Sequence, residues 1–501
     1  MPEYPRDAPV PALCCDRHPR NNEALAFAWA DGQVERRTFG DVADASRALA
    51  RALAAAGVGT GQPVAVVLPQ CPLAPVAHLA LARLDAIAVP LSPLFGPDGL
   101  APRLAQSNAV LALAHAGRAD AVREAAPGLP LWAAEGRFDE LPPADLRARE
   151  ASPPSWARGH GAEAPLCVIF TSGTTAQPKG AVLPRRVIAG RMGGVALAHP
   201  GFPAPGDRFW SPADWAWIGG LHDVLLAPWA AGVPVAAYER RGPFDAARAA
   251  AFVEQLGVRN AFLPPTALRL WMRSGAPAPG LRTLHTAGEP LPEPVHAWAA
   301  KAFAAAPREV YGLTECAFLL VNDEATPGVT GRAVPDVELA LRGDGELAVR
   351  ADAPTMMLGY LAGDALHLPL DGGWLRTGDL AVEAKEGWRV LGRVDDVVKI
   401  GGYRVAPREV EAALLRHAAV DEAAVVGVSD EVRGAALRAF VKLAPGAAAT
   451  DALARELQAW VRDRLASHEV PRSVAFVAEL PRTATGKVRR RDLRGPPESP
   501  E

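Results

Sequence analysis

The chain has 501 residues, 49% of them hydrophobic, and a formal net charge of -3. These values predict a globular protein of about two to four domains, and they exclude the positive field that recruits nucleic acid or an anionic membrane. No run approaches the roughly 18 consecutive apolar residues of a membrane-spanning helix, and the N-terminal residues are polar and rich in proline. We therefore expect a cytoplasmic protein that binds small molecules, with no nucleic acid and no membrane span.

The spacing of cysteine and histidine argues against several common chemistries. The five cysteines include no C-x-x-C pair, and only Cys14 and Cys15 are neighbours. The motifs H-E-x-x-H and G-x-S-x-G do not occur, and the glycines that begin at Gly57 lack the G-x-G-x-x-G spacing. A zinc site, a disulfide framework, an α/β-hydrolase and a dinucleotide-binding loop are therefore not indicated.

In the first part of the chain, strand-like segments alternate with helical ones. Residues 63–69 form an apolar run of strand length, and the alanine-rich residues 74–86 follow with helical periodicity. Residues 151–165 contain prolines and small polar residues, which predicts a linker before a strand over 166–170. The alternation predicts an α/β fold with layered sheets.

Two changes of pattern follow further along the chain. Glycine-broken strands over 345–350, 373–383 and 387–393 are typical of an antiparallel β subdomain. After Arg393, a helix is predicted to begin at the proline of "PREVEAALLRH", strand-like runs follow, and "LARELQAWVRDRL" has one apolar helical face.

These patterns predict two domains. We expect a large N-terminal α/β domain over 1–393, which includes the antiparallel β subdomain, and a small α+β domain over 394–501.

A polar, glycine-rich loop follows the predicted strand at 166–170. It contains the hydroxyl side chains of Thr171, Ser172, Thr174 and Thr175, the glycines Gly173 and Gly180, and Lys179. Hydroxyl donors, close backbone approach and a positive charge suit a polyphosphate. The spacing is not that of a Walker A loop, and an ordinary polar turn is the alternative.

Ordered motifs give this loop a context. "TSGTTAQPKG" at 171–180 is followed by "AGEP", "YGLTE", "GELAVR", "TGDL", "GRVDDVVKIGGYRV" and "PRTATGKVRRRDLR". The set resembles the adenylate-forming superfamily of acyl-CoA synthetases, adenylation domains and luciferases, and within it the acetyl- and medium-chain acyl-CoA synthetases. The chain departs from the usual pattern at Ala176, where the family has glycine.

The resemblance implies an AMP-forming acid–thiol ligase. Such an enzyme attacks the α-phosphorus of Mg²⁺-bound ATP with a carboxylate, releases pyrophosphate, and passes the acyl group to a thiol, usually that of CoA. A carboxylate is already a nucleophile at neutral pH, so positioning and charge stabilisation suffice without a general base. The expected cofactors are ATP, Mg²⁺ and CoA as co-substrate.

The resemblance also assigns roles in the nucleotide site. The loop residues Thr171, Ser172, Gly173, Thr174, Thr175 and Lys179 would hold the β- and γ-phosphates. The adenine pocket would be lined by Gly288, Glu289, Pro290, Glu309, Val310 and Tyr311. Thr314 would bond the α-phosphate, Glu315 would hold the metal, and Asp379 would accept the ribose hydroxyls with help from Arg393.

Other roles fall in the C-terminal part, which the resemblance implies is mobile. Lys487 would be the adenylation lysine, and Arg404 would reach the phosphate in the thioester-forming state, so that Lys487, Thr314, Glu315 and Arg404 form the catalytic set. Gly401, Gly402 and Tyr403 would border the CoA tunnel, and Asp395 would be the hinge. The arginines around Lys487 suggest a nucleic-acid patch less than a solvated basic face, because no aromatic residues are interleaved.

The acyl pocket is expected near Trp217, Gly220 and Gly312. The position of Gly312 is tryptophan in the acetyl enzymes, so glycine implies room for a medium-chain, branched or aryl acid. His222 is interpreted as a core residue. Two alternatives remain at this point: a stand-alone adenylation enzyme that loads a carrier-protein thiol, and a silent nucleotide-binding homologue.

Overall fold

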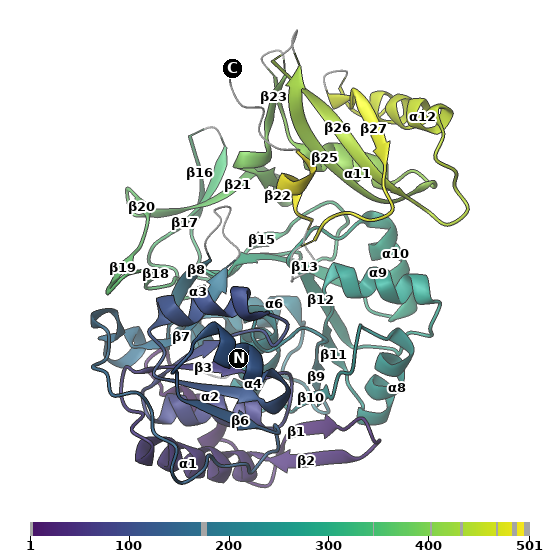
Figure 1. Cartoon of the computed structure of the whole chain (residues 1–501). Coiled ribbons are helices and arrows are strands. Elements are labelled where there is room, and N and C mark those ends of the chain that lie inside the picture. The colour runs from purple at the N-terminus through teal and green to yellow at the C-terminus, as the bar shows by residue number, and fades with distance from the viewer. Residues whose placement is uncertain are drawn as a thin grey trace.

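A largely parallel sheet forms one layer of the computed structural model, which describes residues 4–171, 178–343, 345–400, 403–430, 434–466, 469–482 and 488–494. The sheet runs in the order β19–β18–β8–β7–β4–β3–β5–β6 (Figure 1). Its strands are β3 (Pro63–Val67), β4 (Ile87–Pro90), β5 (Leu111–His115), β6 (Leu131–Ala134), β7 (Pro165–Thr171), β8 (Lys179–Pro184), β18 (Gly359–Ala362) and β19 (Ala365–His367). Strand β3 is buried throughout, as expected for a central parallel strand.

A second sheet contributes most of the candidate site and runs in the order β15–β14–β13–β12–β11–β9–β10–β1–β2. Its strands are β1 (Glu23–Ala28), β2 (Val34–Thr38), β9 (Phe209–Trp210), β10 (Val235–Tyr238), β11 (Asn260–Phe262), β12 (Thr283–Ala287), β13 (Pro307–Leu313), β14 (Ala317–Val321) and β15 (Arg332–Ala333). Strands β11, β12 and β13 are parallel, so their carboxyl ends meet at one edge.

Helices pack around these sheets. They are α1 (Phe39–Ala55), α2 (Leu73–Arg83), α3 (Pro97–Ser107), α4 (Ala119–Ala125), α5 (Val187–Gly190), α6 (Met192–Ala198), the π-helical η5 (Gly219–Leu226), α7 (Ala227–Ala230), α8 (Ala246–Leu256), α9 (Pro265–Ser274) and α10 (Glu293–Ala302). Local signals set their ends: Thr38 and Asp41 form a capping box before α1, and Gly257 ends α8 in the left-handed conformation.

An antiparallel sheet and a C-terminal group complete the chain. The antiparallel sheet contains β16 (Leu339–Arg342), β17 (Glu346–Arg350), β20 (Leu370–Asp371), β21 (Trp374–Ala384) and β22 (Gly387–Arg393). The C-terminal group contains η6 (Val394–Asp396), β23 (Val398–Ile400), β24 (Tyr403–Val405), α11 (Pro407–Leu415), β25 (Val420–Asp430), β26 (Gly434–Leu443), α12 (Asp451–Arg462), β27 (Ser473–Phe476) and α13 (Arg490–Leu493). In Figure 1 this group lies on one side of the molecule, beyond β13 and α10.

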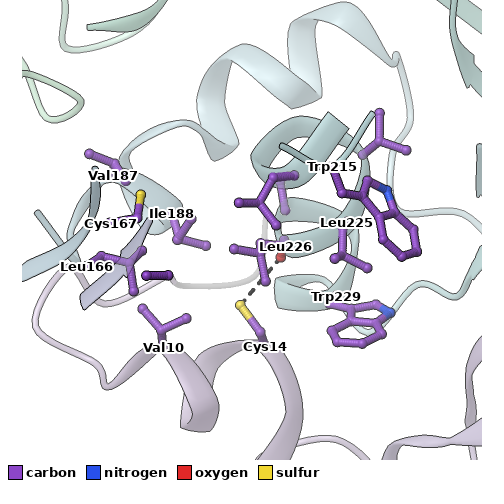
Figure 2. Close-up of a cluster of buried hydrophobic side chains, with 14 of the residues drawn as sticks. Val10, Cys14, Leu166, Cys167, Val187, Ile188, Trp215, Leu225, Leu226 and Trp229 are labelled. Carbon is purple, nitrogen blue, oxygen red and sulfur yellow. Dashed lines mark hydrogen bonds between the residues drawn. The ribbon is translucent and has the colours of Figure 1, made fainter. Parts of the chain in front are cut away.

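A buried apolar cluster fixes helix η5 against the N-terminal segment. Figure 2 shows the Cys14 thiol, which donates a 3.4 Å hydrogen bond to the Leu226 carbonyl, among the side chains of Leu225, Trp215 and Trp229. The Trp229 indole donates to the carbonyl of Ala24 at 2.8 Å. The same cluster that forms the core therefore also sets the position of η5, which borders the candidate site.

The structure confirms the predicted fold class. The predicted segments at 63–69 and 74–86 are β3 and α2, and the three glycine-broken strands are β17, β21 and β22. All five cysteines are free and buried, and burial raises the pKa of the Cys71 thiol to about 12. Among the described residues, no helix has both the length and the apolar character to cross a membrane.

Candidate active site

One cleft of about 2400 Å³ collects most of the residues that the motifs single out. It lies where the carboxyl ends of β12 and β13 approach β8, β21 and the C-terminal group. The predicted residues that line it are Thr171, Lys179, Trp217, Gly220, Gly288, Glu289, Pro290, Glu309, Val310, Tyr311, Gly312, Thr314, Glu315, Asp379, Arg393 and Asp395.

A charged group at one end of the cleft joins Lys179, Tyr360 and Glu315. Lys179 is the first residue of β8, and its Nζ lies 5.5 Å from the centroid of the Tyr360 ring. The Tyr360 hydroxyl donates a hydrogen bond to the Glu315 carboxylate, and the Glu315 carbonyl accepts from the backbone N–H of Met357 at 2.7 Å. The Tyr360 side chain therefore lies near a lysine and holds an oriented carboxylate.

Asp379 is held by a second set of contacts. The Tyr311 hydroxyl donates to its Oδ2 at 2.8 Å, and Arg393 Nη1 lies 3.7 Å from the same oxygen. Arg393 also donates to the Thr377 carbonyl at 3.0 Å. Gly378 makes room for this arrangement: its φ is +74°, and a Cβ there would lie 2.5 Å from Arg393 Nη2.

The two carboxylates of the predicted adenine pocket have different environments. Glu289 accepts from Arg269 at 2.5 Å and from the Thr266 hydroxyl at 3.1 Å, so its charge is paired. Glu309 accepts from the backbone N–H of Leu291 at 2.8 Å. Burial raises the pKa of Glu309 to about 7, an effect that this hydrogen bond only partly offsets.

Both glycines of the predicted acyl pocket line the cleft, and both are also required by backbone packing. A Cβ at Gly220 would lie 2.4 Å from the Asp214 carbonyl oxygen, and one at Gly312 would lie 2.0 Å from the Ala317 carbonyl oxygen. The missing side chain at Gly312 thus reflects the close approach of β14 as well as an opening of the cleft. Trp217 packs edge-on against Phe95, with centroids 6.0 Å apart.

His222 is a core residue, as predicted. It is 0% exposed, and its Nε2 lies 3.6 Å from the sulfur of Cys167. Burial lowers its pKa well below the ordinary value, so the imidazole is neutral.

Several predicted residues lie outside the described part of the chain, namely Ser172, Gly173, Thr174, Thr175, Gly401, Gly402 and Lys487. Tyr403 and Arg404 belong to β24, which pairs with β23. Arg482 and Val488, which flank the segment that contains Lys487, line the cleft. An ion pair joins Arg273 of α9 to Asp421 of β25, and Arg273 Nη2 also lies 3.2 Å from Glu422.

The motifs did not single out Tyr360, Arg269 or Asp223, although Tyr360 and Arg269 contact predicted residues and all three line the cleft. Tyr360 and Arg269 lie in segments without a recognised motif, and Asp223 follows shortly after Gly220 of the predicted acyl pocket. The partners of all three residues are distant in the sequence. The only available signal was the presence of a charged or hydroxyl-bearing side chain within an otherwise apolar stretch, as in "GGLHDVLL" around Asp223.

Most of the chain matches two known protein-family models. The model of AMP-binding enzymes matches residues 13–361, and the model of the AMP-binding enzyme C-terminal domain matches residues 409–487. The chain belongs to the AMP-binding enzyme family. This AMP-binding enzyme is thus a member of the adenylate-forming superfamily, as the ordered motifs predicted, and the expectation of an AMP-forming ligase is confirmed. The expected cofactors ATP, Mg²⁺ and CoA are those of the acetyl-CoA synthetases to which this chain is related.

Individual relatives agree over nearly the whole chain. The acetyl-coenzyme A synthetase of Streptomyces avermitilis is 30% identical over 96% of this AMP-binding enzyme and 82% of the relative. The crystal structure of Brucella canis acyl-CoA synthetase is 33% identical with a TM-score of 0.70, covering 97% of this chain and 94% of that one. A benzoate CoA ligase from Burkholderia xenovorans LB400 is 27% identical with a TM-score of 0.82, covering 98% and 100%.

Proposed function

We propose that this enzyme activates a medium-chain, branched or aryl carboxylic acid as an acyl-adenylate, releases pyrophosphate, and transfers the acyl group to the thiol of CoA. The observation that carries the proposal is the convergence of Lys179, Glu315, Tyr311 and Asp379 on one cleft. A cation, a metal-binding carboxylate and a hydroxyl-binding carboxylate are the groups that a nucleoside triphosphate requires.

The triphosphate end of the site is the group around Tyr360. Lys179 supplies positive charge to the β- and γ-phosphates, and Thr314 donates its hydroxyl to the α-phosphate. Glu315 fits Mg²⁺, because this cation accepts a single carboxylate when substrate phosphates complete its shell. When bound, Mg²⁺ would neutralise phosphate charge, and the hydrogen bond from Tyr360 would hold the Glu315 carboxylate in place to bind it.

The nucleoside end is the group around Asp379. Its carboxylate accepts the ribose hydroxyls, while Tyr311 and Arg393 hold it in place. Residues 288–290 and Glu309 border the base. Glu289 is paired with Arg269, so its side chain holds residues 288–290 in place. Glu309, which also lines the cleft, is the carboxylate that faces the adenine.

The acid lies against the wall formed by Trp217, Ile218, Phe262 and Phe318, which are aromatic or branched and line the cleft. Such a wall suits a bulky apolar acyl group better than acetate. The similarity to a benzoate CoA ligase supports an aryl acid within this class.

Adenylation and thioester formation take place in the same cleft. Residues 394–501 rotate about Asp395, relative to residues 1–393, between the two half-reactions. The orientation described here has Arg482 and Val488 at the cleft, which supports adenylation by the intervening Lys487. The other orientation brings Arg404 and the 401–403 loop, which borders CoA, to the same place. Lys487→Ala should therefore lower adenylation by about 10²-fold while thioester formation from preformed acyl-adenylate survives; Gly402→Leu should do the reverse.

The test is acid-dependent exchange of pyrophosphate into ATP, followed by thioester formation with CoA or with a carrier protein. We expect exchange that requires both Mg²⁺ and an acid, and consumption of CoA. Thioester formation only with a carrier protein would assign the chain to carrier loading. Absence of exchange with every acid in a broad panel would overturn the proposal and favour a silent nucleotide-binding protein.

A further inference from the structure

A buried ion pair stands in the wall of the cleft on helix η5. Asp223 lies one helical turn after Gly219 and pairs with Arg191, the residue before α6. The Arg191 side chain is 0% exposed and that of Asp223 is 7% exposed. Asp223 nevertheless lines the cleft, as do Gly219, Gly220 and Phe262.

Burial of this ion pair lowers the stability of the fold unless other interactions offset the lost hydration. Two charges removed from water lose several kcal/mol of hydration each, and buried pairs of this kind can often be replaced by apolar residues without loss of stability. Burial raises the pKa of Asp223, and the Arg191 guanidinium opposes this rise, so the ion pair favours the ionised carboxylate. A wall that contacts only a hydrocarbon chain gains nothing from an ionised carboxylate.

One carboxylate oxygen of Asp223 is free to receive a ligand. Oδ1 accepts from Arg191 Nη1, and among the described residues no hydrogen bond reaches Oδ2. Arg191 is held from the other side by a 3.0 Å hydrogen bond from its Nε to the Val187 carbonyl, and it does not line the cleft. The surface of the cleft therefore presents the Asp223 carboxylate, a fixed hydrogen-bond acceptor, and not the Arg191 guanidinium.

We infer that the acid activated by this enzyme bears a hydroxyl or amino group on its acyl part, remote from the reacting carboxylate, and that this group donates a hydrogen bond to Asp223. The inference rests on the proposed function and names its substrate more closely. An acyl group with a second carboxylate is disfavoured at this wall, because it would place two negative charges together.

The test compares matched acids in pyrophosphate exchange with the unmodified enzyme. Benzoate and hexanoate are each compared with their hydroxy, amino, methyl and methoxy derivatives, and each derivative is supplied as its set of positional isomers. We expect the best hydroxyl or amino isomer to exceed both its methyl and its methoxy counterpart by about tenfold or more in kcat/KM, since a donor is present only in the former. Equal rates for all isomers, with exchange still measurable, would overturn the inference while leaving the proposed function intact.

A neutral double variant tests the assignment to Asp223. Arg191→Leu with Asp223→Leu removes both charges together and leaves no unpaired ion in the core. The preference for the donor-bearing acid over its methyl counterpart should fall by about tenfold or more. The matched control is Arg83→Leu with Asp16→Leu, a partly buried pair at 2.8 Å that does not line the cleft, which should leave the preference unchanged.

The outcomes are distinguishable. A double variant that keeps the wild-type preference places the donor contact elsewhere and overturns the inference. If the double variant fails to fold, the comparison of hydroxyl with methoxy isomers in the unmodified enzyme decides alone. Loss of exchange with every acid in the unmodified enzyme contradicts the proposed function instead.

Discussion

Tyr360 connects two charged residues of the cleft that are far apart in the sequence. Its ring lies against the Lys179 ammonium, and its hydroxyl donates to Glu315. Burial raises the pKa of Tyr360, and the neighbouring Glu315 carboxylate, which accepts its hydrogen bond, raises it further because a negative charge disfavours a phenolate. Tyr360 is therefore a fixed donor that orients Glu315 at any pH at which the enzyme works.

Glu315→Gln should retain the hydrogen bond from Tyr360 and lose the charge that binds Mg²⁺. We expect pyrophosphate exchange to fall by about 10- to 100-fold and to require more Mg²⁺, with no change in melting temperature. A titration of exchange rate against Mg²⁺ measures the effect. Tyr360→Phe, which keeps the ring beside Lys179, is the matched control and should raise the Mg²⁺ requirement by less. An unchanged Mg²⁺ titration for Glu315→Gln would remove this residue from the metal site.

Glu309 should make stability depend on pH. Its pKa is about 7 in the folded protein and has the ordinary value of 4.5 in the unfolded chain. Between these values the folded state retains a proton that the unfolded state has lost, so the free energy of unfolding should decrease as pH rises from about 4.5 to 7. Denaturant unfolding of Glu309→Gln at pH 5 and 8 should show a smaller decrease than the wild type. The same pH dependence in both proteins would contradict a raised pKa at Glu309.

At the scale of elements, the pairing of β21 with β22 builds the ribose-binding group. Register pairs Asp379 with Arg393 across the two strands. Because Gly378 has no side chain, the Arg393 guanidinium can pack directly over its backbone. The position of Arg393 therefore depends on this glycine.

Gly378→Ala should disturb this strand pair. The alanine must adopt a φ of +74°, and its Cβ would overlap the Arg393 guanidinium. Gly373→Ala is the control, because its φ is +85° and a Cβ there has no atom within 4 Å. The control should cost about 1 kcal/mol of stability and keep the Michaelis constant for ATP. Gly378→Ala should cost more and also raise that constant, and equal effects of the two substitutions would rule out the contact with Arg393.

At the scale of the whole molecule, the C-terminal group is held against α9 by charge. Among the described residues, the ion pairs that link residues up to 393 with later ones are those of Arg273 with Asp421 and Glu422. Glu422 is also paired with Arg482, and Lys442 Nζ lies 3.4 Å from it. Burial opposes ionisation of Glu422, and these cations outweigh it and lower its pKa.

Arg273→Ala should therefore weaken the orientation in which Arg482 and Val488 reach the cleft. We expect pyrophosphate exchange to fall by about two- to fivefold, the range of a partly exposed ion pair, and thioester formation from preformed acyl-adenylate to be unaffected. Raising the ionic strength should reduce exchange in the wild type and leave the variant nearly unchanged. The control is Arg332→Ala, which breaks an exposed 2.9 Å pair with Glu324. An equal loss in both half-reactions would show that Arg273 does not act through the orientation of the C-terminal group.

The fold class, the ordered nucleotide motifs and the family could all be predicted from the amino-acid sequence, because they depend on patterns within short segments. Hydrophobic periodicity predicted β3 and α2, and glycine spacing predicted β17, β21 and β22. Local chemistry indicated Lys179, which belongs to the hydroxyl- and glycine-rich loop, whereas Glu315 and Asp379 were indicated only by the order of the motifs that contain them.

The contacts of these residues could not be predicted from the sequence and became known from the folded structure. Three contacts join residues that are far apart in the sequence, namely Tyr360 with Glu315, Arg191 with Asp223, and Arg273 with Asp421. No local sequence pattern predicts such long-range contacts. The raised pKa values of Glu309 and Asp223 depend on burial by distant elements, which a linear sequence does not display. Gly312 illustrates the same reason: the motif suggested an empty pocket, and the distance to the Ala317 carbonyl oxygen showed that the backbone of β14 itself requires the glycine.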